Sequence, residues 1–230
     1  MLKLSKEQTV ISELVKEFQS QFESMTPDIQ KKILNLIRRG IYERSEYESI
    51  FAEYIQLSDD AMTTFVKVIK EHQRLAKKLG VKVLLTQDGL RDLELIQEIA
   101  VDKMRSLTEK YIDDMRMFGL RSQIEGASNL KLSNGMQDMF AQIGRNLGAE
   151  INTAMAYSDS TIKKGIYEQA GIKKYKYVGP NDSKTRDICA ETLSDPRQET
   201  GWTMDEIEAS NTPFIERGGW NCRHEWVPVE

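Results

Sequence analysis

The residues with the greatest chemical potential in this sequence are two cysteines and a histidine in its last third. Cys189 and Cys222 are the two cysteines of the chain, and His224 follows Cys222 by two positions. Residues i and i+2 of a strand point to the same face, so Cys222 and His224 could aim at one point, which Cys189 could join from a short helix. Zinc binds thiolates and imidazoles in a tetrahedron, and Asp182 could supply a fourth, oxygen ligand.

Three interpretations of these residues remain open. The first is a zinc site formed by Cys189, Cys222, His224 and Asp182. The second is a disulfide bond, which is less expected because two cysteines without a secretory signal indicate a reducing compartment. The third is a pair of small buried thiols beside a hydrogen-bonded histidine.

Two arginines, Arg186 and Arg223, lie in polar, turn-rich motifs close to carboxylates. The planar guanidinium group can grip a carboxylate through two parallel hydrogen bonds. We therefore expect Asp182 to form a partly buried ion pair with Arg186 or Arg223 that fixes the loop. The alternative is that these arginines grip phosphate.

Short strands and a short helix must position these side chains. Tyrosine and valine alternate with lysine over residues 175–178, turn residues follow, and β-forming residues return at 226–229. Asp182 or Ser183 could cap a short helix over 185–190. The last third therefore predicts a small strand–helix–strand unit, too small to bury a core alone.

Taken together, these motifs resemble the bacteriophage minor head protein family of the Mu F-like type, often called head morphogenesis proteins. The shared pattern is an aromatic strand, then D-x-x-T-R-x-x-C, a variable loop and a closing N-C-R-H element. The resemblance covers residues 148–229 and implies a structural virion component near the portal rather than a catalyst. The motif residues, with the adjoining tryptophan, are Tyr177, Asp182, Thr185, Arg186, Cys189, Trp220, Asn221, Cys222, Arg223 and His224.

Helical periodicity dominates the chain before this motif, so the predicted fold class is mainly α with a small α+β C-terminal module. We predict three regions: N-terminal helices over 1–85, long helices over 86–172, and the module over 173–230.

Local signals give the expected helix boundaries. The first helix should end near Glu23 and the second should begin at Pro27, because proline is favoured at the first helical position. Ser58 should cap a helix that reaches Leu79. A long helix should run from about Gly89 to Arg121, and a loop over 126–132 should separate it from a helix capped by Ser133. Asp159 or Ser160 should then begin a separate short helix over 161–169.

A basic stripe on the helix before Leu79 could lie against phosphates of nucleic acid. A solvated helix face is the more common outcome of such a pattern. The stripe consists of Lys67, Lys70, Arg74, Lys77 and Lys78. His72 falls on the opposite, apolar side, where we expect a hydrogen-bonded core histidine.

Composition excludes several classes of protein. The formal net charge of −4 gives no global basic field to attract nucleic acid. No apolar run approaches the length of a membrane span, and the N-terminal residues lack the features of a signal peptide. Phosphate-binding glycine loops and the common hydrolase and zinc-protease motifs are absent from the sequence. The Glu206-Ile207-Glu208 triplet matches an element of ADP-ribosyltransferase toxins that are fused to some Mu F-like proteins, but we expect no enzyme activity.

The sequence and the resemblance together predict a minor head or head morphogenesis protein that acts at the portal or inner capsid. Its expected partners are the portal, major capsid or scaffold proteins, with several copies in the virion head, no membrane, and no cofactor except the zinc considered above. It would occupy the host cytoplasm during assembly. The alternatives are a DNA-associated internal protein, ejected or retained, and a toxin-like ADP-ribosyltransferase.

Overall fold

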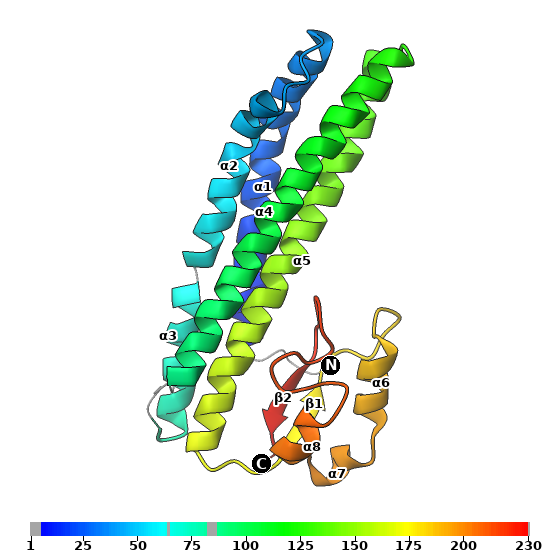
Figure 1. Ribbon diagram of the computed structural model, residues 1–230. Helices are drawn as coiled ribbons and strands as arrows, with labels where there is room; N and C mark the ends of the chain where they lie inside the picture. The colour runs from blue at the N-terminus through cyan, green and yellow to red at the C-terminus, as the bar shows by residue number, and fades with distance from the viewer. Residues whose placement is uncertain (1–5, 64, 82–86, 230) are drawn as a thin grey trace. The chain divides into compact units, whose positions relative to one another are not determined.

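The computed structural model describes residues 6–63, 65–81 and 87–229 (Figure 1). The described chain is mostly helical with one two-stranded sheet, so the predicted fold class is confirmed. Its elements are α1 (Lys6–Arg38), α2 (Arg44–Thr63), α3 (Phe65–Lys78), α4 (Gln87–Ile124), α5 (Asn129–Gln169), β1 (Tyr175–Val178), α6 (Asp187–Ser194), α7 (Arg197–Thr200), α8 (Met204–Glu208) and β2 (Glu225–Pro228).

Spatial proximity groups the chain into two units, and α1, α4 and α5 each contribute to both. Within the described residues, unit 1 comprises 6–12, 65–81, 87–98 and 152–229, and unit 2 comprises 13–63 and 99–151. This grouping is drawn differently from the three sequence regions, which stay a prediction.

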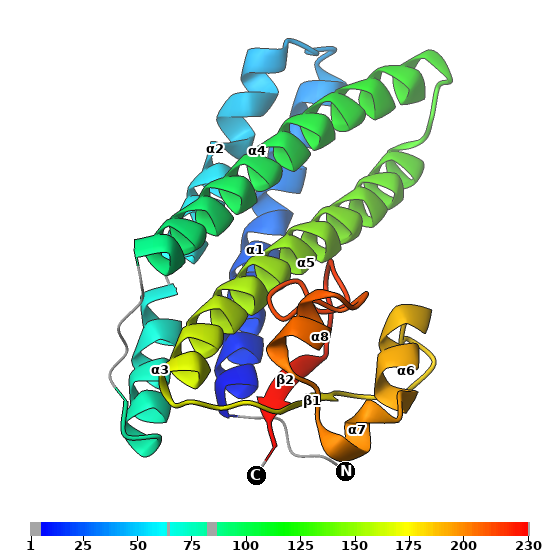
Figure 2. The ribbon, with the colours of Figure 1, turned by 60° about the horizontal axis from the view of Figure 1, so that its bottom comes forward.

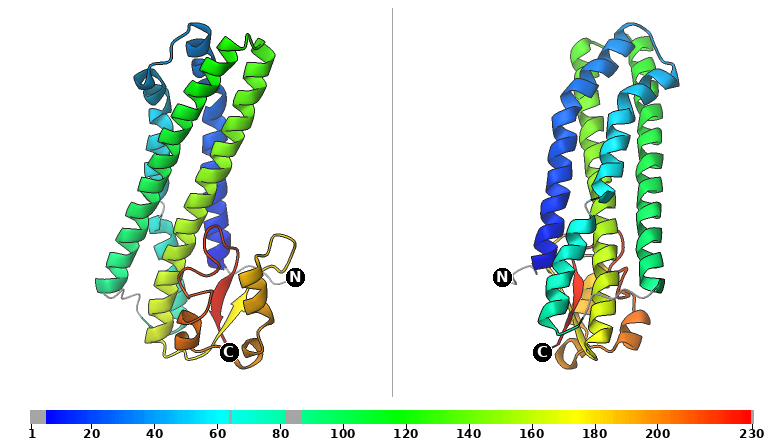
Figure 3. Two further views of the ribbon diagram at one scale, coloured as in Figure 1. Left: turned by 45° about the vertical axis from the view of Figure 1, so that its right-hand side comes forward. Right: turned by 90° about the vertical axis from the view of Figure 1, so that its left-hand side faces the viewer.

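Unit 2 is an antiparallel bundle of four helical segments, from α1, α2, α4 and α5 (Figures 1 and 3). Phe51 of α2 stacks near Phe140 of α5, with ring centroids 6.2 Å apart. At one end, the Tyr42 hydroxyl donates a 2.5 Å hydrogen bond to Gln123, which ties the α1–α2 turn to the end of α4. The bundle therefore combines aromatic packing in its interior with a hydrogen bond between the α1–α2 turn and α4 at one end.

The predicted break between Glu23 and Pro27 is wrong, because α1 continues through both residues. Phe22 precedes the proline, and Ile29 and Ile33 follow it on one buried stripe. Burial of that stripe outweighs the single backbone hydrogen bond that proline removes. The Thr26 hydroxyl also donates a 2.9 Å bond to the Phe22 carbonyl, so it serves the helix interior rather than a cap.

The predicted cap at Ser58 is also wrong, since α2 runs on to Thr63 and α3 begins at Phe65. Serine is only mildly unfavourable inside a helix, so its presence alone does not end one. The long helix predicted from Gly89 to Arg121 is confirmed as α4, which extends a few residues further at each end.

The third wrong boundary is the one predicted at Asp159 or Ser160. Helix α5 continues through both residues to Gln169, and at its other end it begins at Asn129, before the predicted cap at Ser133. Asp159 is fully buried rather than at a helix end. Its partners, described below, explain why a residue that usually caps helices lies inside one.

Unit 1 contains the sheet, and both predicted strands are confirmed. β1 and β2 pair antiparallel, with Tyr177 opposite Trp226. The strand pair lies between the C-terminal part of α5 and α6 (Figures 1 and 2). Its apolar core draws side chains from α3, α4, α5 and the segments that follow α5: Ala76, Leu93, Ile162, Ile166, Tyr167, Tyr175, Tyr177, Cys189, Trp202, Ile207, Phe214, Cys222 and Trp226.

Candidate functional site

The side chains of Cys189, Cys222 and His224 converge in unit 1, and we call them the thiol–imidazole cluster. Cys189 comes from α6, and Cys222 and His224 directly precede β2. The two Sγ atoms are 3.9 Å apart, and Cys222 Sγ is 3.6 Å from His224 Nδ1. All three ligand-type atoms lie within 4.8 Å of one another, and all three residues are buried. The convergence predicted from the sequence is therefore present.

Backbone and aromatic groups pack closely around the cluster. A Cβ atom at Gly218 would overlap Cys189 Sγ and would lie 3.0 Å from Cys222 Sγ. The Tyr177 hydroxyl lies 3.5 Å from each of the two sulfurs. Glycine is therefore required at position 218, because the chain passes directly over the sulfurs.

His224 is held in one orientation. Its Nε2 lies 2.8 Å from the Pro180 carbonyl oxygen, and its ring stacks on Tyr177 with centroids 5.3 Å apart. A carbonyl oxygen can only accept, so Nε2 carries a hydrogen and Nδ1 is the atom that faces Cys222. The His224 backbone N–H donates to the same sulfur at 3.4 Å.

The two thiols differ in acidity. Burial would raise the pKa of Cys222, but hydrogen bonds from the donors around its sulfur, among them the His224 backbone N–H, outweigh it and lower the pKa to about 6. Burial raises the pKa of Cys189 and that of the Tyr177 hydroxyl. Cys222 is therefore the first of these groups to become an anion.

Asp182 is paired with Arg223 rather than with the cluster. The two guanidinium nitrogens donate to the two carboxylate oxygens at 2.9 and 2.6 Å. These hydrogen bonds, with one from the Lys184 backbone, hold the pKa of Asp182 well below its usual range. The expected ion pair is confirmed with Arg223, although both side chains are more exposed than predicted, at 44% and 38%.

Two further predictions for Asp182 fail. Its oxygens are committed to Arg223 and the Lys184 N–H, so it is not placed as a fourth metal ligand. Neither Asp182 nor Ser183 caps α6, because the N-cap is Arg186 and no side chain bonds there. Asp182 instead closes its own turn, in which its N–H donates to the Thr185 hydroxyl at 2.9 Å.

Arg186 holds the loop that covers the sulfurs. Its guanidinium donates to the Gly218 carbonyl at 2.5 Å and to the Trp220 carbonyl. The same loop is tied to α5, because the Asn221 backbone N–H donates to the Thr153 hydroxyl at 2.8 Å. Asn221 also accepts a 2.8 Å hydrogen bond from Asn152. The Trp220 side chain itself is 46% exposed.

A buried charge network beside the cluster was missed in the sequence. Asp159 accepts from His72 Nε2 at 3.0 Å and from Arg217 Nη2 at 2.6 Å, and Lys163 Nζ lies 3.1 Å away. Lys163 also pairs with Glu225 at 2.7 Å. We call these five residues the buried charge network. His72 is thus the hydrogen-bonded core histidine that was expected.

The network balances two carboxylates against two permanent cations. Burial would raise the pKa of Asp159, but Lys163, His72 and Arg217 outweigh it and hold the pKa below its usual value. Arg217 Nη1 also donates to the His224 carbonyl at 3.3 Å, which connects the network to the cluster. The i, i+4 spacing of Asp159 and Lys163 was the one available sequence signal.

The basic stripe predicted for DNA contact lies on α3. On α3, the side chains of Arg74, Lys77 and Lys78 are exposed, whereas those of Lys67 and Lys70 lie outside the described residues. Contact with DNA stays a prediction.

Glu206 has a structural partner. Its carboxylate accepts from the backbone N–H and the hydroxyl of Thr203 in a capping box at the start of α8. Glu208 pairs with Lys164 at 2.7 Å.

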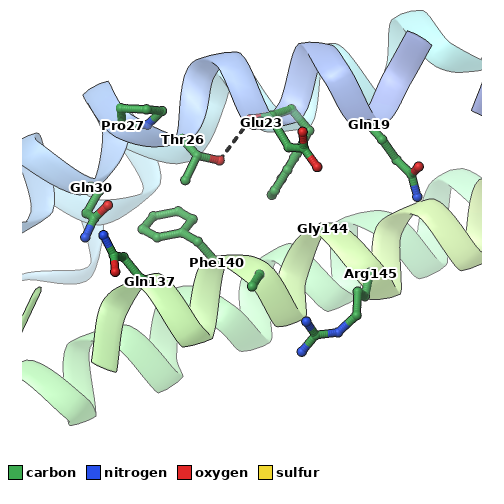
Figure 4. A pocket seen from close by; sticks show the side chains of 11 residues that line it. Gln19, Glu23, Thr26, Pro27, Gln30, Gln137, Phe140, Gly144 and Arg145 are labelled. Carbon is green, nitrogen blue, oxygen red and sulfur yellow. Dashed lines mark hydrogen bonds between the residues drawn. The ribbon is translucent and has the colours of Figure 1, made fainter. Parts of the chain in front are cut away.

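Unit 2 carries a hollow between α1 and α5 that the sequence did not predict (Figure 4). Its volume is about 490 Å³. Its charged lining residues are Glu23 and Arg145, and the remainder is mainly glutamine and apolar, with neither cysteine nor histidine. The lining therefore lacks the thiol and imidazole groups on which the thiol–imidazole cluster is built.

Comparison of the chain with protein-family models, with curated proteins and with solved structures found no match. Among the described helices, none combines the length and the apolar character that crossing a membrane requires. The resemblance to minor head proteins consequently enters below as a proposal.

Proposed function

We propose that this chain is a structural virion protein of the minor head or head morphogenesis type, acting at the portal or inner capsid during phage head assembly. The observation that carries the proposal is that the motif residues bind one another. Asp182 grips Arg223, and Arg186 holds the carbonyls of Gly218 and Trp220. Groups committed in this way hold a fold together and are not presented to a substrate.

The burial of the most reactive side chains supports the same proposal. Cys222 and His224 form a thiol–imidazole pair, yet they are only 8% and 2% exposed. A nucleophile and its base must be reachable by the reacting atom. A structural role for the pair is therefore favoured over a catalytic one.

The tip of the bundle in unit 2 offers a surface for a protein partner. Met117, Leu120 and Ile124 recur along α4 at the spacing of one helix face, and Leu130 lies in the first turn of α5. Their exposed fractions run from 36% for Leu120 to 78% for Ile124. We call these four residues the apolar tip. Apolar side chains gathered in this way are typical of protein-binding sites.

The test is co-expression of the full chain with the portal and major capsid proteins encoded at the same locus, followed by affinity purification. The proposal expects stable association with the portal, the capsid or both. Ile124→Asp combined with Leu130→Asp should weaken that association at least tenfold. Leu95→Asp is the matched control, because Leu95 is a 51% exposed leucine of α4 outside the apolar tip. Failure of the full chain to bind any head protein would sink the proposal.

Binding to packaged DNA is the second candidate, supported by the exposed Arg74, Lys77 and Lys78 on α3. Neutralised phosphates release counterions, so such binding should weaken steeply with salt. Lys77→Glu with Lys78→Glu should reduce DNA retention at low salt. Equal retention by this variant and the unmodified chain would remove the candidate.

A further inference from the structure

We propose that the thiol–imidazole cluster binds a zinc ion through Cys189 Sγ, Cys222 Sγ and His224 Nδ1. The inference does not depend on the virion role. It rests on distances, on the orientation of His224 and on the fit of the surrounding groups.

The distances match the edges of a zinc tetrahedron. Zn–S bonds of about 2.3 Å and Zn–N bonds of about 2.0–2.1 Å give edges of about 3.8 Å between sulfurs and about 3.6 Å between sulfur and nitrogen. The observed separations are 3.9 Å for the Cys189–Cys222 pair and 3.6 Å for Cys222 and His224. The third pair lies within 4.8 Å, so a small side-chain rotation completes the set.

His224 is prepared as a metal ligand. A histidine bound to zinc usually donates its other ring N–H to a carboxylate, a water or a backbone carbonyl, which fixes the tautomer. Here Nε2 lies 2.8 Å from the Pro180 carbonyl, so the lone pair of Nδ1 faces Cys222. The His224 backbone N–H at 3.4 Å from Cys222 Sγ adds a donor to a thiolate.

The Tyr177 hydroxyl occupies the fourth side of the cluster. Its oxygen is 3.5 Å from each sulfur, close to the edge of about 3.5 Å expected between a sulfur and an oxygen ligand of one zinc ion. The fourth corner of the tetrahedron therefore faces this hydroxyl. A zinc ion there joins α6 to the segment before β2, which suits a structural site.

A disulfide bond fits the same residues less well. Its S–S length of about 2.05 Å requires the sulfurs to move together by almost 2 Å. The bond would also leave the buried Nδ1 of His224 without its sulfur partner.

The experiment is a metal analysis of the full chain, purified without a metal-binding tag under reducing conditions with added zinc. We expect one zinc per chain by elemental mass spectrometry. Replacement with Co²⁺ should give a thiolate-to-cobalt charge-transfer band and the strong visible bands of tetrahedral cobalt. Cys222→Ser and His224→Gln should each lose stoichiometric zinc. Tyr177→Phe should bind zinc about 10- to 100-fold more weakly, because it removes the hydroxyl that faces the fourth corner.

His72→Gln is the matched control, because His72 is also a buried, hydrogen-bonded histidine of unit 1 but lies outside the cluster. It should keep one zinc even if it is less stable. Should Cys222→Ser fail to fold, protection of both thiols of the unmodified chain from alkylation, reversed by a chelator, provides the same test. Two free thiols without metal after zinc addition would overturn the proposal. So would a Cys189–Cys222 disulfide that persists under these reducing conditions, seen as a mass lower by two hydrogens.

Discussion

Replacing Asp159 with asparagine isolates the role of the buried charge network. The substitution preserves shape but removes the charge that faces Lys163, Arg217 and His72. An asparagine amide offers one accepting oxygen, whereas its NH₂ group would meet other donors. The two buried cations, Lys163 and Arg217, would then be balanced by a single carboxylate, that of Glu225, which pairs with Lys163.

The expected cost follows from burial. Both Asp159 and Lys163 are almost completely buried, at 0% and 3% side-chain exposure. Removing one partner of such a buried pair typically costs about 3–5 kcal/mol, because the other charge remains uncompensated. Asp159→Asn should therefore lower the free energy of unfolding of unit 1 by about this amount.

Urea unfolding followed by tryptophan fluorescence is the appropriate assay, because Trp202, Trp220 and Trp226 all belong to unit 1. Asp182→Asn is the control, since Asp182 pairs with Arg223 on the surface and should change stability little. A cost below about 1 kcal/mol for Asp159→Asn would refute the reasoning.

The remaining predictions concern the same unit. Because the pKa of Asp159 is lower in the folded chain, its charge stabilises the fold fully above the unfolded pKa of about 3.9, and this stabilisation is lost as the pH falls further. The free energy of unfolding should therefore fall less steeply with acid in Asp159→Asn than in the unmodified chain. Gly218→Ala should lower the free energy of unfolding by about 1–3 kcal/mol, because the added methyl group overlaps the cluster. Gly165→Ala, in open space on α5, should instead raise it by about 0.5–1 kcal/mol. Equal urea midpoints for the two variants would contradict this expectation. Arg186→Lys should speed amide hydrogen exchange over residues 218–222, because lysine lacks the planar fork that bonds the Gly218 and Trp220 carbonyls together. Unchanged exchange would show that these two hydrogen bonds do not hold the loop.

The sequence predicted best what is encoded by local pattern. Alternation of tyrosine and lysine located β1. Cys222 and His224 converge with Cys189 as predicted, although both precede β2 and do not lie on the expected strand. The Asp182–Arg223 pair followed from the geometric match of guanidinium and carboxylate. The strand signal lies within a few residues, whereas the ion pair joins residues 41 positions apart.

Capping signals misled where burial outweighs them. Pro27 and Asp159 are local stop or start signals, but both lie within continuous helices. The apolar stripe on either side of Pro27 is buried, and the partners of Asp159 include Arg217, 58 positions away. The network therefore could not be read from any window of the sequence.

The connection from Arg217 to Asp159 has a consequence for synthesis on the ribosome. Asp159, Lys163 and His72 all emerge before Arg217 and Glu225, which complete their charge balance. Cys222, His224 and β2 emerge in the same late stretch. A nascent chain that has reached residue 216 thus lacks two of the five residues of the buried charge network and one of the two described strands. Unit 1 is consequently expected to close only after this stretch has been translated.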